Sequence, residues 1–209
     1  MNNKDKLLII GASGHGRVIA NIALCMNTYS HIAFLDDSES KKSLANYDTI
    51  GNTSNIKDFI DEFDMIVGIG DNETRAKFQM KLKYLNVTIP ILVHPSAIIG
   101  ERVKIGEGSV VMANAVINCD TTIGAGCIIN TAATIDHDNI IGDFVHVSPG
   151  SHTAGTVSIG SKSWLGIGSI VRNNITICEN CNVGAGAVVV KNISCEGTYI
   201  GIPSTKIKK

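Results

Sequence analysis

Three histidines stand close together in the second half of this 209-residue chain, at a spacing that suits proton chemistry. His137, His146 and His152 fall within sixteen residues. An imidazole has a pKa of about 6.5, so it can remove a proton from an amine or a hydroxyl at neutral pH. A carboxylate on the other ring nitrogen would raise the basicity, and Asp138 follows His137 directly. Because neighbours in a strand point to opposite faces, Asp138 can serve His137 only if the chain turns there.

A glycine-rich segment near the start of the chain has the character of a phosphate loop. Residues Gly11 to Gly16 lie between an apolar run and a helical stretch, where backbone N–H groups and the helix dipole favour phosphate. Their order, GxxGxG, differs from the GxGxxG dinucleotide fingerprint, although Asp36 stands where a ribose-binding acid would end the second strand. A nicotinamide-dependent oxidoreductase is therefore one alternative. Tight packing of a strand against a helix is a second explanation of the glycines.

Cys178 and Cys181 form a CxxC motif, which is half of a common zinc site. Structural zinc needs four ligands, and no second pair stands at a matching distance. We therefore expect no metal, and we favour the interpretation that these two small residues fill a narrow core. Nothing in the sequence suggests secretion, so we expect all six cysteines to be reduced.

Charge and hydropathy restrict the partners of the chain. Its 18 basic and 19 acidic side chains give a formal net charge of -1, with no basic run beyond the last few residues, which argues against nucleic-acid binding. No apolar stretch approaches the roughly 18 residues of a membrane span. We expect a soluble, cytoplasmic chain without a signal peptide or membrane insertion.

Composition divides the chain near residue 97. Eight of the nine leucines precede this point, whereas 15 of the 21 glycines follow it. In the first part, apolar runs alternate with helical stretches, which indicates a small parallel α/β sheet. The expected strands cover Lys6–Ile10, Ile32–Leu35, Asp64–Ile69 and Ile89–Val93, and the expected helices cover Arg17–Met26 and Glu73–Leu85.

The second part repeats every six residues. From Ile99 to Val189, fifteen of sixteen positions at this spacing are Ile, Val or Leu, and Thr153 is the exception. Neither a helix nor an alternating strand has a period of six, whereas a solenoid with one short strand per face does. Glycine directly follows seven of these positions, where a turn would require positive φ or the absence of a side chain. These glycines are Gly100, Gly106, Gly124, Gly142, Gly160, Gly166 and Gly184.

The repeats resemble those of the hexapeptide-repeat acyltransferases. The whole layout, with its GASGHG loop, its repeats and the ending Gly201–Pro203, is similar to that of bacterial sugar acetyltransferases. That family includes nucleotide-linked amino-sugar N-acetyltransferases and sialic acid O-acetyltransferases. The resemblance implies a small Rossmann-like α/β domain that binds a nucleotide-sugar over residues 1–96. It implies a left-handed parallel β-helix acetyltransferase domain with a short C-terminal tail over residues 97–209.

The same resemblance assigns roles to individual residues. The family's catalytic base falls on His137 and its acidic partner on Asp138. The residues implied to hold the nucleotide-sugar are Ser13, Gly14, His15, Asp36, Asp37, Gly70 and Asn72. Those implied to contact acetyl-CoA are His146, Gly155, Ile167 and Gly168. Asn72 could equally cap the following helix, His146 could be a surface histidine, and Trp164 could pack at a subunit face or beside CoA.

The resemblance implies an acetyl-CoA-dependent N-acetyltransferase of surface glycan biosynthesis. Its acceptor would be the amino group of a nucleotide-linked 4-amino-dideoxy-sugar, with UDP the best-known nucleotide. Acetyl-CoA would be a co-substrate bound between the prisms of a homotrimer, and the acceptor would attack the thioester directly without a metal. Two alternatives remain open: a sialic acid O-acetyltransferase, and a non-catalytic trimeric scaffold that binds sugar.

Overall fold

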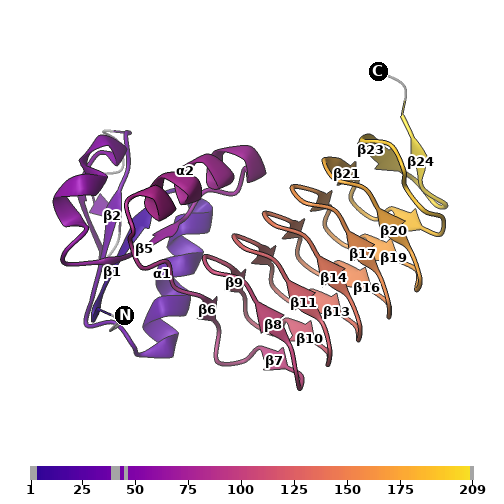
Figure 1. The fold of residues 1–209 in the computed structure, drawn as a ribbon, viewed down its shortest axis with the longest axis horizontal. Coiled ribbons are helices and arrows are strands. Elements are labelled where there is room, and N and C mark those ends of the chain that lie inside the picture. The colour runs from indigo at the N-terminus through magenta and orange to yellow at the C-terminus, as the bar shows by residue number, and fades with distance from the viewer. Residues whose placement is uncertain (1–3, 39–42, 45–46, 208–209) are drawn as a thin grey trace. The chain divides into compact units, whose positions relative to one another are not determined.

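A computed structural model describes residues 4–38, 43–44 and 47–207 (Figure 1). The chain divides into two compact units, Met1–Leu92 and Val93–Lys209. None of the helices in the described ranges is long and apolar enough to cross a membrane.

The first unit is built on a five-stranded sheet in the order β3-β4-β2-β1-β5. Neighbouring strands are parallel, except that β3 is antiparallel to β4. The strands are β1 (Lys6–Ile10), β2 (His31–Leu35), β3 (Ser43–Leu44), β4 (Tyr47–Gly51) and β5 (Asp64–Val67). The helices are α1 (Gly14–Met26) and α2 (Asn72–Tyr84), and a 3₁₀ helix, η2, covers Thr53–Phe59.

The fourth parallel strand of this sheet differs from the sequence-based prediction. The strand at this place is β4. The prediction that Ile89–Val93 forms a strand of this sheet is wrong. Only Leu92–Val93 is extended there, as β6, and it joins a sheet of the second unit. Along β4 the residues alternate between half-buried and exposed, so β4 has no apolar run that would reveal it.

Glycine allows α1 to start very close to the end of β1. A Cβ added at Gly16 would lie 2.0 Å from the carbonyl oxygen of Gly11 and 3.4 Å from the Phe34 ring. A side chain therefore cannot fit at this position without moving the backbone. The tight-packing explanation therefore applies to this glycine. On the other face of the sheet, Leu8 and Ile10 share a core with Leu82 of α2.

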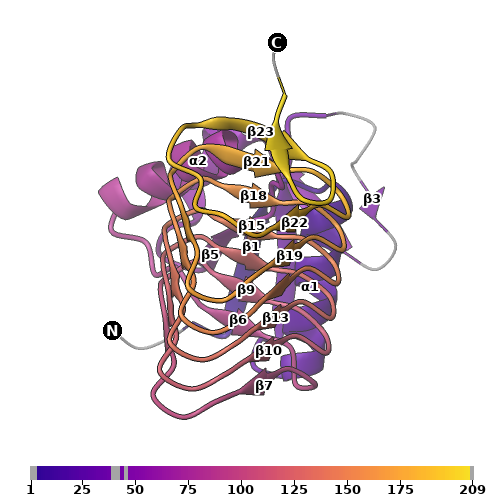
Figure 2. The same cartoon turned by 90° about the vertical axis from the view of Figure 1, so that its right-hand side faces the viewer.

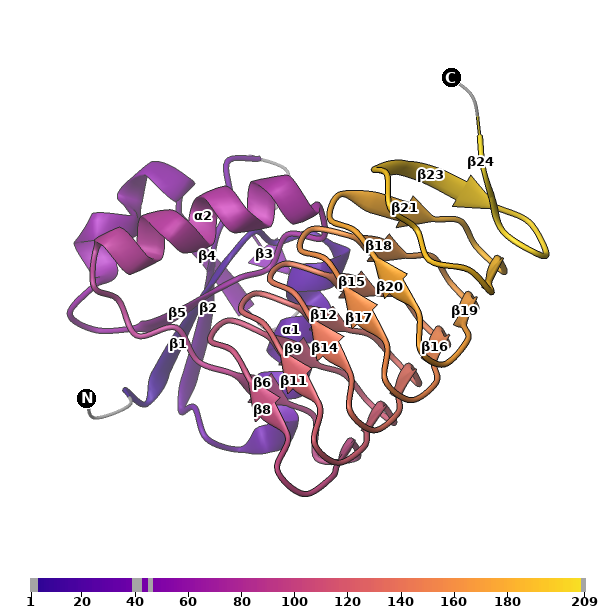
Figure 3. The same cartoon turned by 45° about the vertical axis from the view of Figure 1, so that its right-hand side comes forward.

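The second unit is a parallel β-helix whose short strands pair with strands eighteen residues further on, as Val116 pairs with Thr134. Figures 2 and 3 show its coils stacked one upon the next in chain order. One sheet has the order β7-β10-β13-β16-β19-β22, a second β8-β11-β14-β17-β20, and a third β6-β9-β12-β15-β18-β21-β23-β24.

The strand bounds follow the six-residue period. The first sheet contains β7 (Ile98–Ile99), β10 (Val116–Ile117), β13 (Thr134–Ile135), β16 (His152–Thr153), β19 (Ile170–Val171) and β22 (Val188–Val189). The second contains β8 (Lys104–Ile105), β11 (Thr122–Ile123), β14 (Ile140–Ile141), β17 (Ser158–Ile159) and β20 (Thr176–Ile177). Besides β6, the third contains β9 (Val110–Val111), β12 (Ile128–Ile129), β15 (His146–Val147), β18 (Trp164–Leu165), β21 (Cys181–Val183), β23 (Gly197–Ile200) and β24 (Thr205–Lys206).

The corners of the coils explain the glycines of the repeat. Positive φ occurs at every sixth residue from Arg102 to Gly186, two positions after the predicted turn glycines. The glycines at 106, 124, 142 and 160 instead lie where a Cβ would approach the next coil to between 2.3 and 2.7 Å. Of the two reasons offered for these glycines, the absence of a side chain is therefore the one that applies.

The core of the β-helix is filled by the second residue of most strands, and Thr153 occupies one of these positions. Its hydroxyl is buried and has no hydrogen-bond partner among the described residues. Thr121 is equally buried, but its hydroxyl donates to the carbonyl of Asp136 (2.9 Å) and accepts from the N–H of Asn139 (3.2 Å). An unpaired buried hydroxyl destabilises a fold, whereas a paired one does not.

These two threonines provide a matched test. We expect Thr153→Val to raise the free energy of unfolding by about 1 kcal/mol and Thr121→Val to lower it by a similar amount. Thermal unfolding followed by circular dichroism at one protein concentration would measure both changes. If Thr153→Val were the more destabilising of the two substitutions, this account of the core would be wrong.

Candidate active site

His137 lies on the turn that joins β13 to β14. Asp138 has a φ of +57°, so the chain bends immediately after the histidine. The bend brings neighbouring side chains to the same side, and His137 Nδ1 lies 2.7 Å from Asp138 Oδ2. With Nδ1 bound to a carboxylate, Nε2 is the nitrogen that can accept a proton.

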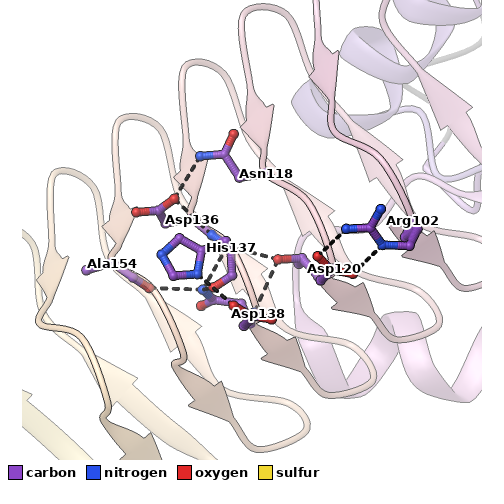
Figure 4. A network of polar contacts seen from close by, with 9 residues as sticks. Arg102, Asn118, Asp120, Asp136, His137, Asp138 and Ala154 are labelled. Atoms are coloured by element: carbon purple, nitrogen blue, oxygen red, sulfur yellow. Dashed lines mark hydrogen bonds and ion pairs between the residues drawn. The ribbon is translucent and has the colours of Figure 1, made fainter.

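The imidazole ring of His137 lies against the next coil (Figure 4). A Cβ added at Gly155, eighteen residues further on, would lie 2.6 Å from both Cε1 and Nε2 of His137. Glycine at this position therefore leaves the space that the ring occupies. Gly155 was expected to contact acetyl-CoA, and its immediate neighbour in this structure is the histidine.

A buried asparagine fixes the backbone of this turn. Asn139 is fully buried, and its side-chain N–H groups donate to the carbonyls of Asp136 (2.8 Å), His137 (3.1 Å) and Ala154 (2.9 Å). Valine or isoleucine occupies the corresponding place in the coils at 103, 157 and 175, and Thr121 occupies it in the preceding coil. Asn139 thus replaces a core residue with a side chain that ties the turn to itself and to the next coil.

Acidic groups surround the imidazole and favour its charged form. The hydrogen bond that His137 donates to Asp138 is the main cause that raises the pKa of His137, and the negative charge of Asp136 adds to it. Asp136 accepts from Asn118 Nδ2 (2.8 Å) and from the His137 N–H (2.9 Å), and these bonds lower its own pKa. A more distant carboxylate, Asp120, also raises the pKa of His137 slightly.

Asp120 is itself bound to a cation. Arg102 Nε and Nη2 lie 2.6 and 2.7 Å from the two oxygens of Asp120, and this paired geometry lowers the pKa of Asp120 (Figure 4). The two residues lie on successive corners of the coil stack, eighteen positions apart. The ion pair therefore anchors Asp120 and offsets part of its effect on the histidine.

A second polar group lies on the sheet that contains β15 and β18. The rings of His146 and Trp164 stack with centroids 4.8 Å apart, and His146 Nε2 lies 3.1 Å from Asn130 Nδ2. The indole N–H of Trp164 donates to Ser148 Oγ at 2.7 Å. His146, Ser148, Trp164 and the exposed Ile167 line a pocket of about 420 Å³.

Only two of the four residues expected to contact acetyl-CoA line this pocket. His146 and Ile167 line this one pocket, whereas Gly155 lies beside His137. Gly168 is at a corner with a φ of +64°, and its N–H donates to the carbonyl of Pro149. The sequence left open whether Trp164 packs at a subunit face or beside CoA. In the structure its side chain lines the pocket.

In the first unit, Asp36 and Asp37 accept hydrogen bonds from different segments of the chain. Asp36 accepts from the N–H groups of Ala12 (2.7 Å) and Ser38 (2.9 Å), so it ties the glycine loop to the end of β2. Asp37 accepts from the N–H and hydroxyl of Thr53, at 2.8 and 2.9 Å. Both aspartates line a pocket of about 410 Å³ together with residues 49–52.

At Ser13 and Gly14, the glycine loop makes few side-chain contacts with the rest of the first unit. Ser13 stands at the N-terminus of α1, where its hydroxyl makes no capping bond and reaches the carbonyl of Gly68 at 3.5 Å. A Cβ added at Gly14 or Gly70 would meet nothing within 4 Å. Space is therefore open above both positions, beside the positive end of the helix dipole.

His15 is held neutral within the same loop. Burial, and then the positive charge of Arg75, lower its pKa to about 4. Its Nε2 is buried without a hydrogen-bond partner in the described part of the chain. Arg75 is almost fully buried and donates to the carbonyl of Gly70 (2.8 Å) and to Asn72 Oδ1 (2.7 Å). At neutral pH, His15 therefore adds no charge beside Arg75.

One capping role was assigned to the wrong residue. Asp71 caps α2, since its carboxylate accepts from the N–H of Thr74 at 2.9 Å. Asn72 is the first helical residue and holds Arg75. An acidic N-cap is as effective as asparagine, which is why the sequence alone does not separate the two.

The cysteines of the CxxC motif lie on either side of the β-helix corner at Asn180. Cys181 is part of its core, and Cys178 packs against the core. Across residues 4–38, 43–44 and 47–207, no group of three or more His, Cys, Asp or Glu side chains is placed to hold a metal.

Comparison with protein families gives one match in each unit. Residues 6–82 match the PglD N-terminal domain family, and residues 156–191 match the family of bacterial transferase hexapeptides with six repeats. The UDP-N-acetylbacillosamine N-acetyltransferase of Bacillus subtilis is 35% identical over 109 residues. That match spans 50% of this chain and only 50% of the length of the relative.

Solved structures resemble this chain over nearly its whole length. The acetyltransferase domain of PglB from Neisseria gonorrhoeae has a TM-score of 0.95 and 38% identity, with 98% of this chain and 100% of that chain covered. The same domain has been solved in complex with acetyl coenzyme A. PerB from Caulobacter crescentus, in complex with CoA and GDP-perosamine, has a TM-score of 0.92 and 32% identity, with 97% of each chain covered.

The contacts around His137 predict an order of pKa effects. Asp138→Asn removes the carboxylate whose hydrogen bond contributes most, so the pKa of His137 should fall toward the ordinary value. Asp120→Asn removes a weaker contribution and should lower the pKa less. Titration of the His137 ring signals by NMR would measure both shifts, with wild type as the reference. A larger fall in the Asp120 variant would contradict the observed geometry.

Proposed function

The chain belongs to the hexapeptide-repeat family of bacterial sugar acetyltransferases, and from this premise we propose that it N-acetylates a nucleotide-linked 4-amino-dideoxy-sugar with acetyl-CoA. The observation that carries the proposal is the His137–Asp138 pair, a base with its partner on the exposed turn of a β-helix. Such a sugar would serve surface glycan biosynthesis. The reaction belongs in the cytoplasm, where acetyl-CoA is formed.

His137 would be the general base. Asp138 holds the proton on Nδ1, which leaves Nε2 to take a proton from the amine of the sugar as its nitrogen attacks the thioester carbonyl carbon. The C–S bond then breaks, and the CoA thiolate takes up a proton. No covalent intermediate on the enzyme is needed. The raised pKa of His137 makes it a stronger base, although less of it is unprotonated at neutral pH.

Acetyl-CoA would lie along the sheet of β15 and β18. The pocket formed there by His146, Trp164 and Ile167 offers apolar surface for the pantetheine chain, and the indole is already fixed by its bond to Ser148. Gly168 would bring backbone close to the same ligand. Gly155 would act through the ring of His137 beside it as well as through any contact with acetyl-CoA.

The nucleotide-sugar would be held by the first unit. Its phosphates would meet the N-terminus of α1 above Ser13 and Gly14, where the space is open. The pocket bounded by Asp36 and Asp37 would take the nucleoside, while Gly70, Asn72 and the neutral His15 would border the sugar. UDP is the nucleotide we propose, and GDP is the alternative to test beside it.

The assay compares two histidine variants on a panel of acceptors. We expect thiol release from acetyl-CoA with a UDP-linked or GDP-linked 4-amino-sugar, and we expect His137→Ala to lower kcat/KM by about 10² to 10⁴. His152→Ala is the matched control, because His152 is exposed on β16 and its Nδ1 contacts only Thr134 Oγ1 among the described residues. It should leave the rate unchanged.

Other results would overturn parts of the proposal. Turnover on sialic acid alone would make the chain an O-acetyltransferase. Full activity of His137→Ala would remove the histidine from the chemistry. Silence on every acceptor, with sugar binding retained, would favour a non-catalytic scaffold.

The proposal also includes a homotrimer. Several large apolar side chains of the β-helix are exposed, among them Ile98 (62%), Ile140 (60%) and Ile170 (45%), and such surface is typical of contacts between subunits. Light scattering should therefore give a mass of about three times the 22.2 kDa chain. A single-chain mass at micromolar concentration would exclude a site shared between subunits.

A further inference from the structure

Two cysteine sulfurs touch at the corner of the β-helix that contains Asn180. Cys178 Sγ and Cys181 Sγ are 3.3 Å apart, on either side of the turn formed by Glu179 and Asn180. Asn180 has a φ of +54°, like the other corner residues, and this bend folds the two side chains toward each other. The sulfurs are thus in contact but not bonded.

The repeat shows that packing alone does not require this pair. In the four preceding coils, the position of Cys178 is occupied by glycine, at 106, 124, 142 and 160. The position of Cys181 is occupied there by serine, cysteine, valine and serine, at 109, 127, 145 and 163. Only this coil has sulfur at both positions, although the same corner is built elsewhere without it.

The two sulfurs differ in their surroundings. Cys181 is 1% exposed, and its sulfur lies against the carbonyls of Glu179 (3.6 Å) and Cys195 (3.8 Å). Burial raises the pKa of Cys181 to about 12, so it is a thiol at neutral pH. Cys178 is half-buried and is the sulfur that a small molecule can reach first.

A pocket opens beside this corner. Its volume is about 320 Å³, and its lining includes Asn180, Gly197 and Lys206. Asn180 precedes Cys181 in the chain, and Gly197 is the strand partner of Cys181. The amine of Lys206 suits the carboxylates that small biological thiols carry.

We propose that Cys178 and Cys181 are a thiol–disulfide site that reacts with low-molecular-weight disulfides such as oxidised glutathione. The Cys178 thiolate attacks one sulfur of the disulfide, which forms a mixed disulfide and releases one thiolate. Cys181 then attacks the Cys178 sulfur, loses its proton and expels the second thiol. In total, two protein thiols are oxidised and one disulfide is reduced to two thiols. The sulfurs need to approach only to the roughly 2.0 Å of a disulfide bond.

The site is independent of acetyl transfer, since it involves neither His137 nor the glycine loop. Its test therefore does not depend on the proposed function. It also differs from the exposed cysteines: Cys25 and Cys195 can form mixed disulfides, but neither has another thiol within bonding contact among the described residues.

Peptide mapping after oxidation tests the proposal. Full-length protein is incubated with oxidised glutathione, its remaining thiols are alkylated, and it is digested with trypsin. Arg172 and Lys191 bound one tryptic peptide that contains both cysteines. We expect this peptide to lose two hydrogens in mass and to escape alkylation. Cleavage after Glu179, between the cysteines, should give two fragments that separate only on reduction.

The repeat supplies variants that should fold. Cys178→Gly and Cys181→Ser each restore the residue found at the same corner in other coils, and both should abolish the internal crosslink. Cys195→Ser is the control and should form the crosslink as wild type does. A crosslink between Cys195 and either member of the pair would overturn the proposal. So would an unmodified peptide under conditions that glutathionylate Cys25.

Discussion

The backbone hydrogen bonds that join each coil to the coil eighteen residues later are the constraint on which the rest of the second unit depends. They place residues of equal phase directly above one another, as Val116 lies beside Thr134 and Thr134 beside His152. Every residue that departs from the apolar pattern therefore lies beside the residues eighteen positions before and after it. The histidine turn is such a departure, and it is held by partners from the coils on both sides: Asn118 before it and Ala154 after it.

His137 and His15 have opposite environments. His137 is exposed among carboxylates, which raise its pKa, whereas His15 is half-buried near a guanidinium, and its desolvation and then this positive charge lower its pKa. The same side chain is thus biased toward a charged form in one unit and fixed as neutral in the other. This separation suits a proton acceptor in the first case and a hydrogen-bonding contact in the second.

The period of six, the two-part division and most elements of the α/β sheet could be predicted from the sequence, because burial gives them a regular pattern. Strand β4 could not, since its residues are only half-buried. The role of Asn139 was also missed. Its signal was present, as a polar residue in a core phase that valine or isoleucine holds in every other coil except that of Thr121. The three backbone acceptors of Asn139 become visible only when the coils are stacked. The stacking of Trp164 on His146 follows from the same register, at eighteen residues.

The corners with positive φ, which recur every six residues, also restrict how such a chain can change in length. An insertion of one residue would shift every later side chain between core and solvent and would move each corner away from the residue that tolerates it. An insertion of six residues would restore the alternation between core and solvent, but every later strand would move to the next of the three sheets. His146 and Trp164 would then no longer share a face with their present neighbours. Only the gain or loss of a complete coil of eighteen residues preserves both the core phase and the assignment of each residue to its sheet. The β-helix can therefore lengthen or shorten only in whole coils, and each such change moves its sites apart or together by one coil.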